Sequence, residues 1–141
     1  MLSLRNVFVG WLLSLVCVVG HALDLRGVAD VNVTSDTAVI AKDMAFDEAR
    51  RQIVMDVLRQ YADADALAMA VRNAKSSELT ELVAASSIEG EKTSDTTYSA
   101  SIAMVLDAGL TRNWLDDKGI RHWLTDESNR DVFVVNANLS D

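Results

Sequence analysis

The longest stretch of the chain without a helix breaker runs from Ser35 to Tyr61, and it limits the possible fold more than any other feature. The stretch contains no glycine or proline, many alanines, and oppositely charged pairs at helical spacing, such as Asp47 with Arg51. A pair four residues apart stabilises a helix by a few tenths of a kcal/mol. We therefore predict one long helix over this range, lying across a sheet.

This predicted helix has one broad apolar face, made by Phe46, Ala49, Ile53, Val54, Val57, Leu58 and Tyr61. The small residues Ala38, Ala41, Ala45 and Ala49 would let the helix lie close to the strands. Arg50 does not fit, because it projects into the apolar face. Its aliphatic stem can run along that face to the edge. Alternatively, its charge is buried, either in an ion pair with an acid from the sheet or in contact with an anion.

Residues 1–22 have the pattern of an export signal rather than of a folded domain. Arg5 precedes an apolar run from Val7 to Gly20, and small residues, Gly20 and Ala22, close the segment. This order is typical of a secretory signal peptide. We predict cleavage after Ala22, which leaves residues 23–141 as a single domain. The alternative is an uncleaved inner-membrane anchor, although the apolar run is shorter than the roughly 20 residues that a span needs.

Cleavage would remove the only cysteine, Cys17, and would change the net charge from −8 to −9, because the segment holds Arg5 and no acid. So acidic a protein is not expected to bind nucleic acid or to adsorb to anionic lipid. An exported chain that cannot form a disulfide suits the bacterial periplasm. We predict a periplasmic protein with no stable membrane insertion after cleavage.

Apolar and polar residues alternate in two segments, Leu23–Val33 and Thr96–Leu106, which is the pattern of half-buried strands. The second segment pairs with Ser87–Lys92 in a predicted hairpin around residues 93–95. The charged side chains of Ser87–Lys92 are typical of an edge strand and oppose pairing with another sheet. A last, mostly apolar strand is predicted at Val132–Ala137.

The remaining segments predict short helices. After a break at residues 62–65, helical patterns cover Ala66–Ala74 and Glu78–Ala85, as two short helices or one irregular one. Asp107 is a candidate cap for a helix over Ala108–Lys118, which Gly119 would end. The order β-α-α-β-β-α-β predicts an α+β domain with an antiparallel or mixed sheet of about four strands and helices packed on one face.

The chain lacks the residue patterns that most enzymes and metal sites need. Beyond residue 22 there is no cysteine, and His122 is the only histidine, so no metal ligand set is predicted. No Gly-x-Ser-x-Gly motif and no glycine-rich phosphate loop is present. We predict no catalytic residue, no metal and no cofactor. Pairs of carboxylates are plentiful, so a carboxylate-based hydrolase remains a third possible function. We rank it last.

A surface for binding other proteins is the remaining class of site. Trp114, His122 and Trp123 lie close together in the sequence, and aromatic residues often anchor protein interfaces. Both tryptophans can instead belong to the core. With Arg50, these three residues form the predicted interaction surface.

Two segments resemble bacterial envelope domains. Leu25–Leu58, with the pattern from Ala45 to Arg50 in its helix, resembles the amino-terminal domain of flagellar assembly protein T and related envelope lipoproteins. Ser86–Ile120 resembles an uncharacterised family of exported bacterial proteins, a domain of unknown function. That resemblance rests on Glu91, Ser94, Asp95, Tyr98, Leu115, Gly119 and Ile120. It implies a fold and an exported location, but no catalytic residue. No small residue precedes Cys17, so lipid attachment is not expected.

These observations favour a non-catalytic periplasmic module that binds another envelope protein or itself. The alternative is a periplasmic carrier or sensor of a small ligand, with its pocket between the long helix and the sheet.

Overall fold

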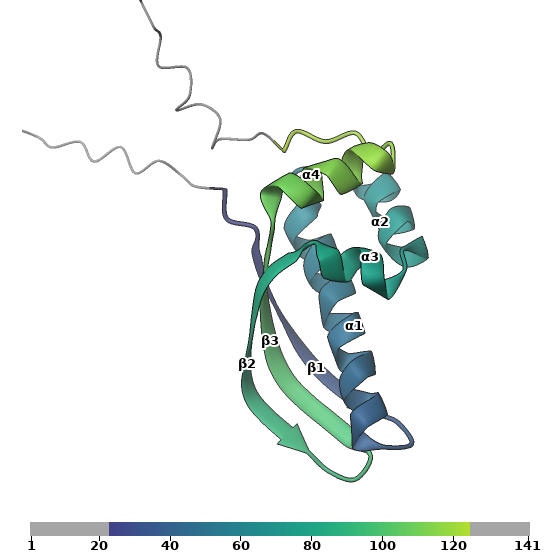
Figure 1. Cartoon of the computed structure of the whole chain (residues 1–141), viewed down its shortest axis with the longest axis vertical. Coiled ribbons are helices and arrows are strands. Elements are labelled where there is room, and N and C mark those ends of the chain that lie inside the picture. Colours follow the sequence, from purple (N-terminus) through teal and green to yellow (C-terminus); the bar gives the residue numbers. More distant parts are fainter. Residues whose placement is uncertain (1–22, 125–141) are drawn as a thin grey trace, which may run out of the picture.

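The structure, a computed structural model, describes residues 23–124 as an α+β fold (Figure 1). In chain order the elements are β1 (Arg26–Thr34), α1 (Ala38–Leu58), α2 (Ala64–Asn73), α3 (Ser76–Glu81), β2 (Val83–Thr93), β3 (Thr97–Leu106) and α4 (Ala108–Asp117). The predicted fold class is confirmed. The predicted signal peptide and the predicted strand at 132–137 lie outside the described residues.

Within residues 23–124 the sheet has three strands, against the four or so predicted, in the order β1-β3-β2 with both pairs antiparallel. The central strand β3 alternates as expected: its even-numbered residues from Tyr98 to Leu106 are buried and the intervening ones are partly exposed. The register between β2 and β3 shifts between Glu89 and Lys92, where Gly90 takes a positive φ of 61°. This irregularity is a bulge in an edge strand.

Helix α1 runs along β1 and β3 on one face of the sheet, while α2, α3 and α4 gather at one end of the domain (Figure 1). In residues 23–124 the opposite face of the sheet carries no helix. The alanines predicted to allow close packing do so, because Ala41, Ala45 and Ala49 are fully buried. The closest approach is at Gly27 of β1, where an added Cβ would lie 2.7 Å from Ile53 Cγ2. The helix therefore packs almost directly on the backbone of β1.

The long helix is shorter at both ends than the predicted range of Ser35 to Tyr61. The N–H of Ser35 still donates to the carbonyl of Thr96, just before β3 (2.8 Å). The helix therefore begins only after Thr37, whose hydroxyl accepts from the N–H of Ile40. At the other end, Ala62 pairs with His122 in an isolated antiparallel bridge. Contacts with distant segments set both ends, and local sequence does not show them.

The region between α1 and the hairpin contains two short helices. Of the two predicted alternatives, two short helices or one irregular helix, the first is confirmed. Asp63 caps α2 by accepting from the N–H of Ala66 (3.0 Å), which explains the break at residues 62–65. The helix predicted over Glu78–Ala85 ends earlier, at Glu81, and β2 begins at Val83 instead of Ser87. Pairing of residues 83–86 with β3 overrides their helix propensity.

Helix α4 matches its predicted signals at both ends. Asp107 accepts from the N–H of Leu110 (2.8 Å), and Gly119 has a φ of 66°. The N–H of Ile120 donates to the carbonyl of Leu115 (2.9 Å) and that of Gly119 donates to Asp116 (2.9 Å). These two bonds form a Schellman motif, which satisfies the last carbonyls of the helix.

Candidate functional site

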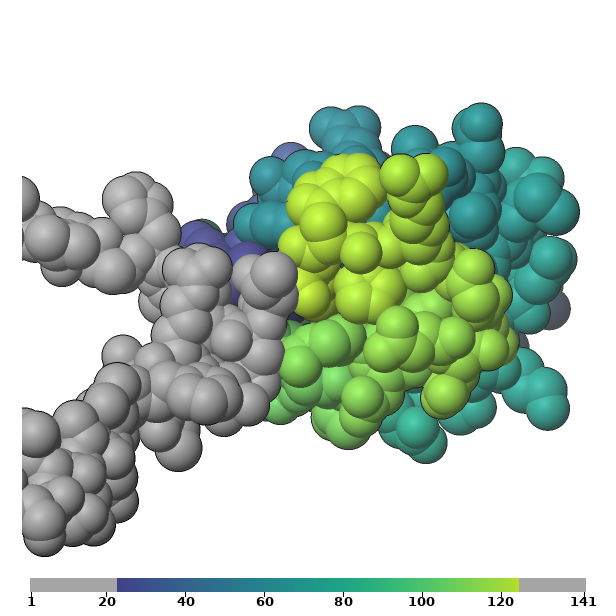
Figure 2. Space-filling view, turned by 90° about the horizontal axis from the view of Figure 1, so that it is seen from above, coloured from purple at the N-terminus to yellow at the C-terminus, as the bar shows by residue number. Residues whose placement is uncertain are grey.

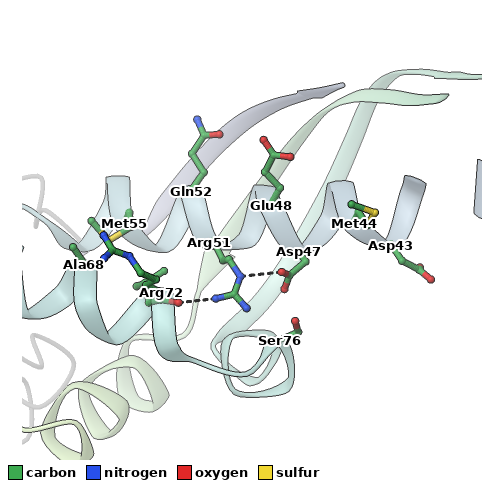
Figure 3. A pocket seen from close by; sticks show the side chains of 11 residues that line it. Asp43, Met44, Asp47, Glu48, Arg51, Gln52, Met55, Ala68, Arg72 and Ser76 are labelled. Atoms are coloured by element: carbon green, nitrogen blue, oxygen red, sulfur yellow. Dashed lines mark hydrogen bonds and ion pairs between the residues drawn. The ribbon is translucent and has the colours of Figure 1, made fainter. Parts of the chain in front are cut away.

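An open groove of about 910 Å³ lies between α1 and α2. It is lined by Asp43, Met44, Asp47, Glu48, Arg51, Gln52, Met55, Ala68, Val71, Arg72 and Ser76 (Figure 3). The pocket of the predicted carrier was instead expected between the long helix and the sheet. Ile53 and Met104, which lie on that side of α1, are buried in the core.

Arg51 joins the two sides of the groove (Figure 3). Its Nε donates to Asp47 Oδ2 at 2.9 Å on α1. Its two terminal nitrogens donate to the carbonyls of Val71 (2.6 Å) and Ala74 (3.0 Å) at the end of α2. A helix leaves its last carbonyls without partners and carries a partial negative charge at that end. The planar guanidinium supplies both the donors and the positive charge, so it fixes α2 against α1.

Asp47 is the common partner of Arg50 and Arg51. Burial tends to raise its pKa, but hydrogen bonds from Ser76 and Arg51, together with the charges of both arginines, hold the pKa below its ordinary value. Arg50 Nη1 lies 3.6 Å from Asp47 Oδ1, and the Arg50 side chain is 14% exposed. Arg50 is thus largely buried and paired, but its acid comes from its own helix and not from the sheet.

The groove also carries apolar side chains. Met44 is half exposed, Met55 is partly buried against the core, and Val71 belongs to the core. Two exposed carboxylates, Asp43 and Glu48, stand at the rim. The unbranched thioether side chain of methionine adapts to partners of different shape, and methionine is frequent on surfaces that bind several partners.

Trp114, the first aromatic residue of the predicted surface, belongs to the core rather than to an open patch. It is 8% exposed and packs between α4 and α3. Its indole Nε1 lies 3.4 Å from Glu78 Oε2, and Lys118 Nζ lies 2.7 Å from the same oxygen. These two contacts lower the pKa of Glu78 and hold α3 against α4.

His122 and Trp123 lie together where α1 passes into α2. His122 Nε2 is 2.8 Å from Asp116 Oδ1. Trp123 is anchored twice, by its backbone N–H to Tyr61 (2.8 Å) and by its indole Nε1 to the carbonyl of Gln60 (2.9 Å), yet 57% of it is exposed. Figure 2 shows the chain after α4 lying across the atoms of the helices beneath it. Arg50, at the middle of α1, pairs with Asp47 of the same helix, and Trp114 contacts Glu78 of α3.

The two tryptophans beyond residue 22 should therefore differ strongly in acrylamide quenching. We expect the processed protein with Trp114→Phe, which keeps Trp123, to be quenched several-fold more than the protein with Trp123→Phe. The reason is that the indole of Trp123 is open to solvent and that of Trp114 is not. Stern–Volmer constants from the two variants give the measurement, and equal constants would contradict the described placement.

Three of the residues on which the resemblance rests, Glu91, Asp95 and Tyr98, hold α1 onto the hairpin. Glu91 pairs with Lys42 of α1 (2.8 Å), and the Lys42 amine lies 5.3 Å from the ring centre of Tyr98, which is buried. Burial and the nearby Glu91 carboxylate raise the pKa of Tyr98. The carbonyl of Asp95 accepts from the N–H of Ala38 (2.9 Å), so the hairpin turn also satisfies the start of the helix.

None of the predicted surface residues lines the groove. Two methionines, Met44 and Met55, lie outside the predicted apolar face of the helix. Their position in the sequence could have indicated the groove. In residues 23–124 no group of three or more potential ligands is placed to hold a metal ion. No helix in that part of the chain is long and apolar enough to cross a bilayer. Comparisons with protein-family models, curated proteins and solved structures find no match.

Proposed function

We propose that the protein is a non-catalytic interaction module of the bacterial cell envelope, and that the groove between α1 and α2 receives a segment of another envelope protein. The observation that carries the proposal is the pair of methionines that line the groove: Met44, which is half exposed, and Met55, which is partly buried and lies about three turns further along α1. A partner laid along the groove would take this apolar surface out of water.

The chemistry of the groove indicates the kind of partner. An apolar anchor would contact Met44 and Met55, and basic residues flanking that anchor would meet Asp43 and Glu48 at the rim. An amphipathic helix laid into a groove is a common way to combine these contacts. The acidic net charge of the whole chain, −8, would further attract a basic segment.

The periplasmic location rests on the sequence of residues 1–22, with cleavage after Ala22 and an uncleaved inner-membrane anchor as the alternative. A role without catalysis is supported by the state of Asp47, the carboxylate inside the groove. Its lowered pKa and its contacts with Arg50 and Arg51 keep it ionised and engaged, so it is unsuited to act as a general acid.

A photo-crosslinking residue in place of Met44 is expected to give a discrete adduct with one envelope protein in living cells. The same residue in place of Met69 should give none, because Met69 of α2 is 63% exposed but does not line the groove. With the partner purified, Met44→Glu should weaken binding about tenfold or more, since it places a charge against an apolar anchor. Absence of an adduct at 44, or equal adducts at both positions, would contradict the proposal.

A small-ligand carrier is the second candidate, favoured by the size of the groove, which falls within the roughly 300–1,000 Å³ of ligand pockets. Native mass spectrometry of the protein purified from its host distinguishes the two functions. A bound small molecule that is lost in Met55→Glu would favour the carrier, and an empty protein that captures a basic amphipathic peptide would favour the interaction module.

A further inference from the structure

Strand β1 forms one edge of the sheet, and half of its backbone N–H and C=O groups point away from the rest of the sheet. Leu25 accepts from the N–H of Leu106 (3.0 Å) and Ser35 donates to Thr96 (2.8 Å), so the odd-numbered residues of β1 bond to β3. In an antiparallel pair the alternate residues then point their N–H and C=O groups outwards. These are Arg26, Val28, Asp30, Asn32 and Thr34. Within the described residues β1 pairs with β3 alone.

The side chains of the same residues are exposed on the face of the sheet that carries no helix. Val28 is 57% exposed, and it stands between a cation, Arg26, and an anion, Asp30, each two residues away. The N–H of Arg26 donates to Asp24 Oδ1 (3.2 Å), an exposed local contact that confirms its outward direction.

We propose that two copies of the chain pair through this edge, antiparallel, about a twofold axis at Val28. In that register Arg26 of each copy lies opposite Asp30 of the other, and Val28 lies opposite Val28. The outward backbone groups of residues 26, 28 and 30 then all find partners, and a single six-stranded sheet forms. Opposite charges directly across a strand pair stabilise it, while like charges destabilise it.

Charge selects this register among those that the backbone permits. Centring the axis on Arg26 or on Asp30 would set a charge opposite its own copy. Centring it on Gly27 would bring Asp24 opposite Asp30. Only the axis at Val28 sets Arg26 of one copy opposite Asp30 of the other, twice by symmetry.

The other free edge is less suited to pairing. Strand β2 is interrupted by the bulge at Gly90, and it carries Glu89, Glu91 and Lys92 near that point. Bulges and charged side chains are features by which edge strands avoid contact with other sheets. The edge that pairs is therefore β1, and the groove between α1 and α2 stays free for a different protein.

Sedimentation velocity of the protein, purified as its host processes it, tests the pairing. We expect a dimer that Arg26→Asp or Asp30→Arg each weakens about tenfold or more, and that the double variant Arg26→Asp/Asp30→Arg restores, because the pairs are then reversed but still opposite. Both side chains are exposed, so circular dichroism should show an unchanged fold. Lys92→Asp on β2 is the matched control and should leave the dimer unaffected.

A second measurement reads the register directly. Residues opposite each other in a hydrogen-bonded antiparallel pair have Cα atoms about 5.5 Å apart, which is within disulfide range. Oxidised Val28→Cys should therefore form a covalent dimer, whereas Thr34→Cys should not. A monomer at all concentrations, a dimer insensitive to both single variants, or no recovery in the double variant would overturn the proposal. Met44→Glu should not alter the dimer, so failure here and failure of the groove are distinguishable.

Discussion

Replacing Arg51 by alanine is expected to lower the free energy of unfolding by about 2–4 kcal/mol. The substitution removes donors from three acceptors at once: Asp47 Oδ2 and the carbonyls of Val71 and Ala74. Each hydrogen bond from a charged group contributes more than a neutral one, and the acceptors left behind are partly buried. Urea denaturation followed by circular dichroism gives the measurement. The loss of stability should be accompanied by easier proteolysis within α2. Among the hydrogen bonds of the described residues, those that join α2 to α1 come from Arg51.

Two matched variants separate this explanation from a general effect of removing a cation. Arg59→Ala, at a side chain that is 66% exposed and 3.8 Å from Asp56, should change stability by no more than about 0.5 kcal/mol. Arg51→Lys keeps the charge but cannot reach the acceptors with a planar fork, so it should recover only part of the loss. A lysine variant as stable as the original protein would contradict the role given to the fork.

The pH dependence supplies an independent check. The pKa of Asp47 is lower in the folded protein than its ordinary value of 3.8, so its contribution to stability is present above that value and is lost as the pH falls through the lowered pKa. Without Arg51 the pKa returns towards 3.8 and the contribution shrinks. The difference in stability between the original protein and Arg51→Ala should therefore narrow below about pH 3.8.

Much of the fold follows from local patterns, because its elements carry their own signals. The alternation from Tyr98 to Leu106, the cap at Asp107 and the left-handed Gly119 each predicted a structure that is present. The errors lie where a distant segment decides. Residues 83–86 have helix propensity, but they form a strand because β3 offers them a partner. Likewise, α1 stops at Leu58 where the segment around His122 comes to lie beside the chain.

The candidate site was less predictable, because it depends on pairs that are far apart in the sequence. The apolar face of the predicted helix drew attention to Arg50, whereas Arg51 makes the contacts that build the groove. Its carbonyl acceptors lie 20 and 23 residues further along the chain, and no periodicity within one helix reveals them. Trp114 and Trp123 could not be told apart from the sequence. In the structure Trp114 is buried against α3, whereas Trp123 is exposed above the end of α1.

Gly27→Val should lower the free energy of unfolding by about 2–3 kcal/mol, although valine is a better strand former than glycine. A Cβ at this position would lie 2.7 Å from Ile53 Cγ2 and 2.9 Å from Val57 Cγ2. Both atoms are methyl groups on branched carbons of a buried helix face, so they cannot swing aside. The helix must instead move away from β1, and the packing of the neighbouring alanines would loosen with it. Thermal or urea denaturation measures the change.

A double-variant cycle tests whether that contact is the cause. In an Ile53→Ala background the methyl group nearest to position 27 is gone, so Gly27→Val should cost less there than in the original protein, and the two changes should not be additive. Gly109→Ala is the matched control, because a Cβ there meets only Asp107 Oδ1 at 3.4 Å and lies within α4. It should change stability by no more than about 0.5 kcal/mol. An unchanged cost of Gly27→Val without Ile53 would show that the close approach of α1 to β1 is not what requires glycine.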